Sequence, residues 1–121
     1  MSPAPHWRIK RIYEPAEKAD GTRVLVDRLW PRGLSRGDAA IDLWLKSIAP
    51  SPELRQWFDH KPERWDEFSR RYWQELAGNE DDLARLRALP APVTLLYGAR
   101  DTAHNQARAL LDFLQDKTAH D

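Results

Sequence analysis

RVLVDRLWPRG, residues 23–33, determines which fold the rest of the chain is expected to form. The apolar run VLV at 24–26 predicts a strand, because β-branched and bulky apolar residues in a row favour buried, extended backbone. Asp27 and Arg28 follow at once, and the PRG at 31–33 ends any ladder. Charged groups at the exit of a buried strand are costly unless they are paired or put to use, so this strand end is a candidate site.

Strand geometry separates the two charges of this segment. Successive side chains of an extended strand point to opposite faces, so Leu25 and Asp27 share one face and Val26 and Arg28 share the other. Asp27 and Arg28 therefore cannot simply pair with each other, and each needs a partner from elsewhere in the fold. We expect the segment to form one wall of a site that other loops complete.

Length and composition are typical of one soluble domain over residues 1–121, with a loose leader at 1–6 and a loose tail at 117–121. The 19 basic and 19 acidic side chains cancel, which argues against nucleic acid as a partner. Without cysteine, disulfides, thiolate metal sites and a cysteine nucleophile are excluded. No apolar run approaches the ~20 residues of a membrane span and no signal-peptide core is present, so a cytoplasmic location without membrane contact is expected.

Strands and helices are predicted to alternate along the chain. Residues 7–13 (WRIKRIY) favour an edge or early strand, and residues 93–97 (VTLLY) a strand buried on both faces. Residues 42–49 (DLWLKSIA) fit both an alternating strand and a helical stripe, and a strand is preferred because Pro50 closes the segment. Caps and apolar spacing predict helices at 52–58 after Ser51, from Pro62 to Gly78, at 81–89 and over 107–114, with a short helical turn within 34–40.

This alternation predicts a small three-layer α/β sandwich, with a mostly parallel sheet of about four strands covered by helices on both faces. In open α/β sheets, ligands bind beyond the carboxyl ends of the strands. Here the loops at those ends are 30–33, 49–51 and 98–101, and they hold most of the unusual polar residues. The sequence therefore places a candidate site at that edge of the sheet.

Four linked motifs add a family resemblance. VDRLWPRG (26–33), APS-x-x-LR-x-WF-x-H (49–60), RW-x-x-F-x-x-RY-x-x-EL (64–76) and LLY-x-ARD-x-x-HN-x-A (95–107) together resemble the bacterial family called domain of unknown function 488 (DUF488). The resemblance runs over roughly residues 8–115 and implies a small α/β protein whose activity is not established. Gly98 and Arg100 stand where Ala or Ser and Lys are expected, and the change at 100 keeps the charge.

The first functional hypothesis is a site for a small anionic or phosphorylated ligand. The planar guanidinium group of arginine suits phosphate or carboxylate. Ser51 and Asp101 precede helix N-termini, whose free N–H groups favour a negatively charged ligand. The candidate ligand-binding residues are Arg28, Trp30, Arg32, Ser51, Arg55, Arg100 and Asn105. The alternative is that these arginines only neutralise Asp27, Asp59 and Asp101 in structural ion pairs. No Walker loop and no GxGxxG is present, so no cofactor is predicted.

The second hypothesis is hydrolase or transferase chemistry, which leaves open whether the protein is an enzyme. The candidate catalytic residues are Asp27, His60, Asp101 and His104, because a histidine beside a carboxylate is a recurrent general base. Ser51 is the one plausible nucleophile, but no GxSxG surrounds it and an N-cap role explains it. A metal site made of these histidines and aspartates is a weaker alternative, since tight in-helix spacing is absent.

A third hypothesis is an interaction module. Exposed tryptophans beside arginines can stack on unpaired bases or dock a protein partner. Trp30, Trp44 and Trp57 are the candidates because they flank the three loops. If all three are buried, this hypothesis loses its contact surface, whereas a tryptophan that lines a cleft with the arginines supports it. The oligomeric state stays open.

Overall fold

A computed structural model describes residues 6–116. They contain a four-stranded sheet in which every neighbouring pair of strands is parallel. The strands are β1 (Trp7–Arg11), β2 (Thr22–Leu25), β3 (Leu43–Trp44) and β4 (Val93–Tyr97), in the spatial order β1-β4-β2-β3. The last strand in sequence therefore lies between the first two. The predicted parallel α/β fold is confirmed, while the predicted leader and tail fall almost wholly outside the described residues.

The helices follow the predicted alternation. Their bounds are η1 (Lys18–Asp20), α1 (Arg36–Ala39), η2 (Lys46–Ile48), α2 (Pro52–Phe58), η3 (Pro62–Arg64), α3 (Trp65–Ala77), α4 (Glu80–Arg87) and α5 (Gln106–Gln115). Side-chain caps mark the starts of α2 and α5, because the Ser51 hydroxyl accepts from Leu54 N–H at 3.2 Å and the Asn105 amide oxygen accepts from Arg108 N–H at 2.9 Å. These caps fix the entry points of α2 and α5, both of which border the site described below.

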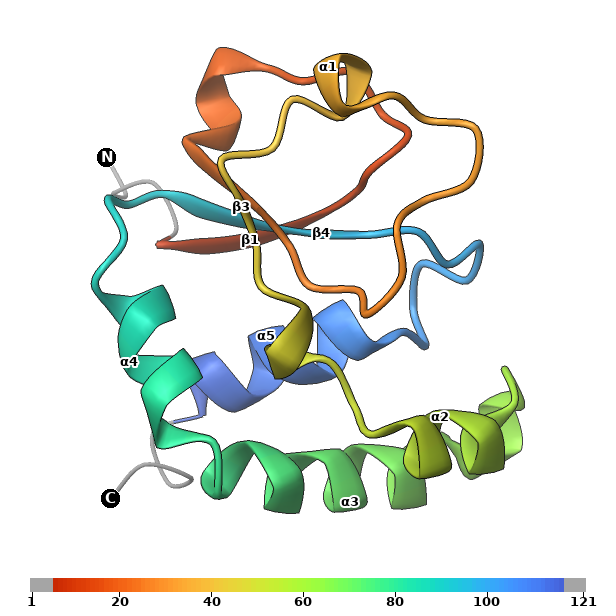
Figure 1. The fold of residues 1–121 in the computed structure, drawn as a ribbon. Coiled ribbons are helices and arrows are strands. Elements are labelled where there is room, and N and C mark those ends of the chain that lie inside the picture. The colour runs from red at the N-terminus through yellow and green to blue at the C-terminus, as the bar shows by residue number, and fades with distance from the viewer. Residues whose placement is uncertain (1–5, 117–121) are drawn as a thin grey trace.

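The two faces of the sheet carry layers of unequal thickness (Figure 1). On one face α3 and α5 cover the larger core, which includes Val24, Leu95 and Leu110. On the other face the short helix α1 and its loops cover a smaller cluster around Leu25 and Leu96. The alternation of β2 and β4 explains this division, since successive side chains serve different cores. The sandwich is thus asymmetric, with its bulk on the α3–α5 side.

The strand preference for residues 42–49 is wrong for most of the segment. Only Leu43 and Trp44 pair with β2, and η2 begins two residues later. Leu45 N–H still donates to Leu25 O at 2.9 Å, but β2 ends there. The tighter 3-10 turn then buries Ile48, whose carbonyl accepts from the Tyr72 hydroxyl at 2.6 Å. The loss of a pairing partner therefore overrides the alternating pattern.

A closed group of charges anchors the thinner layer, and we call Lys10, Asp20 and Arg23 the Asp20 cluster. Asp20 and Arg23 are only 2% and 5% exposed. The Asp20 carboxylate accepts from Arg23 Nη1 at 2.5 Å and from Lys10 Nζ at 3.1 Å. Arg23 also donates to the carbonyls of Ala39 and Ala40, both at 2.9 Å. The cluster thereby ties η1 and the end of α1 to strand β2.

None of the described helices has both the length and the apolar character needed to cross a membrane.

Candidate functional site

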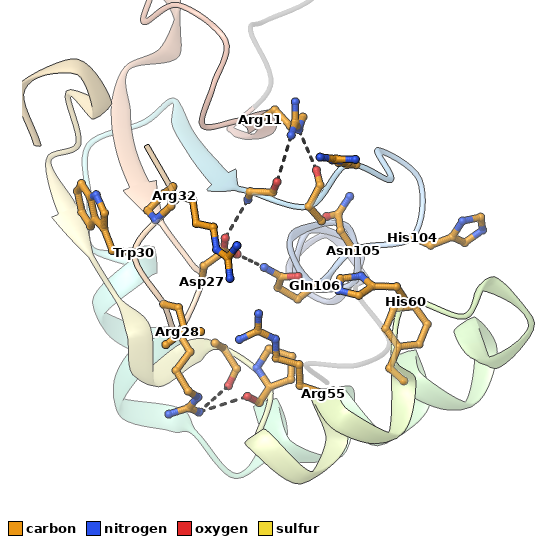
Figure 2. A pocket seen from close by; sticks show the side chains of 18 of the residues that line it. Arg11, Asp27, Arg28, Trp30, Arg32, Arg55, His60, His104, Asn105 and Gln106 are labelled. Atoms are coloured by element: carbon orange, nitrogen blue, oxygen red, sulfur yellow. Dashed lines mark hydrogen bonds between the residues drawn. The ribbon is translucent and has the colours of Figure 1, made fainter. Parts of the chain in front are cut away.

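A cavity of about 700 Å³ opens where β1, β2 and β4 end, at the predicted edge of the sheet (Figure 2). It gathers residues from the loops after these strands and from the start of α5. Nine of the predicted site residues line it: Asp27, Arg28, Trp30, Arg32, Arg55, His60, Arg100, His104 and Asn105. Segments that are far apart in sequence thus meet here.

Asp27 lies at the centre of this cavity, and two protein donors hold its carboxylate. Gly98 N–H donates to Oδ2 at 2.8 Å, and the Gln106 side-chain amide donates to Oδ1 (Figure 2). Burial raises the pKa of Asp27 to about 6, against the lowering effects of the Gly98 hydrogen bond and of the nearby Arg55 charge. The carboxyl group therefore changes charge close to neutral pH.

Gly98 permits this close approach between strand β4 and Asp27. A Cβ atom added at Gly98 would lie 3.2 Å from Asp27 Oδ2. That contact is tighter than ordinary van der Waals distance, so the carboxylate would have to shift. Gly98, where Ala or Ser is expected, thus leaves room for the Asp27 carboxylate.

Five arginines line the cavity with that single carboxylate: Arg11, Arg28, Arg32, Arg55 and Arg100. Arg11 donates through Nε to Ala99 O at 2.9 Å, and Arg28 donates through Nη2 to Pro50 O at 3.3 Å. The buried Nε of Arg28 has no hydrogen-bond partner in the described structure. The ion pairs within 4.0 Å among residues 6–116 include none of these five arginines. The alternative of structural ion pairs with Asp27, Asp59 and Asp101 does not describe this arrangement.

The two interior histidines line the cavity in different ways. His104 Nδ1 lies 3.0 Å from Asp101 Oδ2, and its ring meets Trp65 edge-on at 5.4 Å. His60 follows Asp59, and both residues have left-handed backbone, with φ of 54° and 49°. This conformation is uncommon for residues other than glycine. Only His104 therefore shows the carboxylate-oriented geometry that was predicted for both histidines.

Ser51 and Asp101 are the two predicted site residues that do not line the cavity. The Ser51 hydroxyl caps α2 and donates to Glu75 Oε2 at 2.6 Å, beside a separate hollow. Asp101 accepts the backbone N–H groups of Ala103 and His104, both at 2.9 Å. These bonds and the His104 ring lower the pKa of Asp101. Asn105 lines the cavity but is 2% exposed and caps α5, so local backbone hydrogen bonds occupy all three side chains.

The three candidate tryptophans, Trp30, Trp44 and Trp57, are half-buried, and of these only Trp30 lines the cavity. Trp30 Nε1 donates to Leu34 O and Trp44 Nε1 donates to Asp27 O, both at 2.7 Å. Trp57 is covered by the guanidinium groups of Arg64 and Arg71, at 5.2 and 4.4 Å from the ring centre. A stacking surface made of all three rings is therefore not assembled, while Trp30 stands beside the arginines.

Eleven of the twenty lining residues were not among the predicted site residues, and those with polar side chains are Arg11, Tyr13 and Gln106. Arg11 ends β1, so the carboxyl-end rule could have found it once β1 was placed beside β4. Gln106 is the first residue of α5, one position after the predicted Asn105. The signal was present for both, but it needed the order of strands in the sheet.

No group of three or more potential ligands among the described residues is arranged to hold a metal ion. The metal alternative built on His60, His104, Asp27 and Asp101 therefore finds no geometry here.

Sequence comparisons agree with the resemblance in the motifs. The family model described as the inactive DUF488-N3 subclade matches residues 6–121. The uncharacterized protein YeaO of Escherichia coli (strain K12) is 47% identical over 108 residues, which cover 88% of this chain and 94% of that protein. The uncharacterized protein Rv3073c of Mycobacterium tuberculosis is 43% identical over 112 residues, covering 91% and 94%. No solved structure matches the chain significantly.

Proposed function

Taking as premise that the chain belongs to the inactive DUF488-N3 subclade, we propose that it binds a small phosphorylated anion at the carboxyl edge of the sheet, without turning it over. The observation that carries the proposal is the set of five arginines that share one cavity without forming an ion pair. Such a surplus of positive charge favours a ligand with more than one negative charge.

The charge balance of the cavity differs from that of the rest of the chain. The lining holds five guanidinium groups and one carboxylate, whereas the chain as a whole carries 19 basic and 19 acidic side chains. Elsewhere arginines do find carboxylates, as Arg23 does with Asp20 at 2.5 Å and Arg70 with Glu67 at 2.5 Å. Phosphate oxygens match the fork of guanidinium donors, so a phosphorylated ligand would supply the missing partners.

Helix α5 supports the same conclusion. It runs for 10 residues and begins at Gln106, which lines the cavity. The positive end of its dipole therefore faces the same space as the arginines, and this favours an anion. The helix and the arginines come from different parts of the chain, and both favour the binding of an anion in the cavity.

Acid–base catalysis is the second candidate, and Asp27 is the observation that favours it. A buried carboxyl group whose pKa is raised to about 6 is suited to proton transfer near neutral pH. The description of the family as inactive argues for binding instead. Under the catalytic alternative, replacing Asp27 by Asn would abolish turnover of a bound phosphorylated compound, which product analysis would detect.

The direct test is calorimetric titration and thermal unfolding with inorganic pyrophosphate and triphosphate at low ionic strength. Both anions should bind and should raise the unfolding temperature, because a ligand at 100 times its Kd adds about 2.7 kcal/mol to the free energy of unfolding. Arg55→Gln and Arg100→Gln should each weaken binding by roughly tenfold or more, since hydrogen bonds to charged groups contribute about 1.5–3 kcal/mol.

Arg85→Gln is the matched control, because Arg85 is exposed on α4 and does not line the cavity. It should bind both anions as the unchanged protein does. The proposal fails if neither anion binds at low ionic strength, or if Arg85→Gln weakens binding as much as Arg55→Gln.

A further inference from the structure

The position of Asp27 is unexpected for a site that binds only phosphate. Its carboxylate lies at the centre of the cavity, among five arginines, yet it forms no ion pair with any of them in the described structure (Figure 2). A negative group there repels phosphate oxygens. An ionised Asp27 therefore fits the site only if part of the ligand donates hydrogen bonds to it.

The hydrogen-bonding capacity of Asp27 indicates what that part is. An ionised carboxylate offers about four acceptor positions. The protein fills one on each oxygen, with Gly98 N–H on Oδ2 and the Gln106 amide on Oδ1. Each oxygen thus keeps room for one more donor, and both oxygens belong to the same carboxylate. Two neighbouring hydroxyl groups on a ligand would match them.

Gln106 extends this acceptor surface. Its Nε2 is used on Asp27, and among the described residues its own amide oxygen has no donor. Since Gln106 also lines the cavity, that oxygen is a third acceptor beside the carboxylate. The result is a compact group of acceptors inside a ring of guanidinium donors, and each part selects a different portion of one ligand.

We propose that the ligand is a phosphorylated sugar, with its phosphate oxygens on the arginines and a pair of adjacent hydroxyl groups on Asp27 and Gln106. This inference rests on the proposed function and specifies its ligand class. The same chemistry occurs in a simple sugar phosphate and in a nucleotide, which both carry phosphate and vicinal hydroxyls.

The size and the remaining lining of the cavity suit such a ligand. A volume of about 700 Å³ is within the range of roughly 300–1,000 Å³ found for small-molecule sites. Trp30, Pro31, Phe58 and Phe68 are among the lining residues, so apolar surface is available for the carbon faces of a sugar or an attached ring. Phosphate alone would leave this surface and most of the volume unused.

The test compares ligands that differ by one hydroxyl. Isothermal titration is done with ribose 5-phosphate against 2-deoxyribose 5-phosphate, and with a ribonucleoside diphosphate against its 2′-deoxy form, with inorganic pyrophosphate as the reference. The ribo ligands should bind roughly tenfold more tightly than their deoxy forms, because a lost hydrogen bond to a charged group costs about that factor. The tighter of the two ribo ligands identifies the source, sugar phosphate or nucleotide.

Asp27→Asn separates this inference from the proposed function. The variant should lose the preference for ribo ligands, and it should bind pyrophosphate at least as tightly as the unchanged protein because a repelling charge is gone. Gln106→Met, which keeps the Asp27 carboxylate but removes the third acceptor and one donor to Asp27, should reduce the preference in part and provides a second readout if Asp27→Asn folds poorly.

Equal affinity for ribo and deoxy ligands, with pyrophosphate bound, overturns the inference and leaves the proposed function standing. The inference is also overturned if Asp27→Asn weakens pyrophosphate and sugar ligands by the same factor, because Asp27 then acts only on the shape of the site. Absence of binding to every ligand, pyrophosphate included, overturns the proposed function and the inference together.

Discussion

Asp20 and Asp27 lie just before and just after strand β2, and their surroundings are opposite in kind. Asp20 is 2% exposed and contacts Lys10 Nζ and Arg23 Nη1 at 3.1 and 2.5 Å. Burial alone would raise its pKa, but the Glu17 N–H and these two cations more than offset burial and lower it. Asp27 has five arginines around it and forms no ion pair in the described structure, and burial raises its pKa to about 6.

The difference shows how the same residue type serves the fold at one end of a strand and the site at the other. In the Asp20 cluster the protein supplies every partner, so the charges stabilise the unliganded state. In the cavity the protein supplies two neutral donors to Asp27 and leaves the guanidinium groups without carboxylates. Removing the charge of Asp20 should therefore lower the free energy of unfolding, and removing the charge of Asp27 should raise it.

The largest effect is expected for Asp20→Ala. It leaves Arg23, which is 5% exposed, without its carboxylate, and it leaves Lys10 with only the exposed Glu17. Breaking a buried pair from one side costs roughly 3–5 kcal/mol of unfolding free energy, to be measured by urea unfolding at pH 7. Because the pKa of Asp20 is lowered in the folded state, its contribution is present above the unfolded pKa of about 3.9 and is lost as pH falls through the folded value.

Glu17→Ala is the control for this cluster, because Glu17 also bonds Lys10, at 2.9 Å, but its side chain is 68% exposed. Its loss should cost less than about 1 kcal/mol. If Asp20→Ala and Glu17→Ala destabilise the protein equally, the cluster does not stabilise the fold in the way described.

The next effect in size is a gain in stability for Asp27→Asn above pH 6. The folded pKa of about 6 exceeds the unfolded value of about 3.9, so the folded state binds this proton more tightly. Stability from Asp27 is therefore highest below pH 4 and falls as pH rises to 6. The asparagine variant should be more stable by about 1–3 kcal/mol at pH 8, with little difference at pH 4.

Urea unfolding at pH 4, 6 and 8 checks this pH dependence. His60, His104 and the five arginines also face the cavity, but both proteins contain them, so their contributions largely cancel in the difference. A difference between the two proteins that does not vary with pH would contradict a largely buried Asp27 carboxylate that forms no ion pair.

Gly98→Ala should have a smaller effect, of about 1 kcal/mol in the destabilising direction. The new Cβ lies 3.2 Å from Asp27 Oδ2 and pushes the carboxylate off Gly98 N–H. Gly37→Ala in α1 is the matched control, since no atom lies within 4 Å of its new Cβ, and it should leave stability unchanged or slightly raised. Urea unfolding of the two variants side by side provides the measurement, and equal effects would show that the contact with Asp27 does not matter.

The smallest effect on folding is expected for the combined change of Arg32, Arg55 and Arg100 to Gln. None of the three forms an ion pair in the described structure, and all three are exposed, so the free energy of unfolding should change by about 0.5 kcal/mol or less. Thermal unfolding without ligand measures this change. A large loss would place these arginines with the Asp20 cluster, as part of the scaffold.

Most of the fold was predictable, because local signals agreed with the final packing. The apolar run at 93–97, the cap at Ser51 and the stop at Gly78 all mark elements that the structure contains. The segment 42–49 failed because its conformation depends on where β2 ends, and this is set by tertiary pairing and not by its own alternation.

The carboxyl-end rule for parallel sheets predicted the location of the candidate site, but it could not predict every residue of the site. The carboxyl-end rule for parallel sheets needs only the strand directions, and it placed nine lining residues. Arg11 and Gln106 were missed because finding them requires the order β1-β4-β2-β3, which periodicity does not contain. Ser51 and Asp101 were included because a polar residue before a helix looks the same whether it binds a ligand or caps the helix.

The central position of β4 sets the order in which this protein can assemble during synthesis. β1 and β2 each pair with β4 and not with each other, so the described residues before β4, 6–92, contain only the two-residue β2–β3 pairing. Until residues 93–97 leave the ribosome, the inner edges of β1 and β2 are without a partner and open to wrong pairing. The cavity closes later still, when Gln106 arrives with the last helix. A chain cut before residue 93 therefore lacks most of the sheet as well as the site, and one cut between residues 97 and 106 lacks only the part of the site that the last helix supplies.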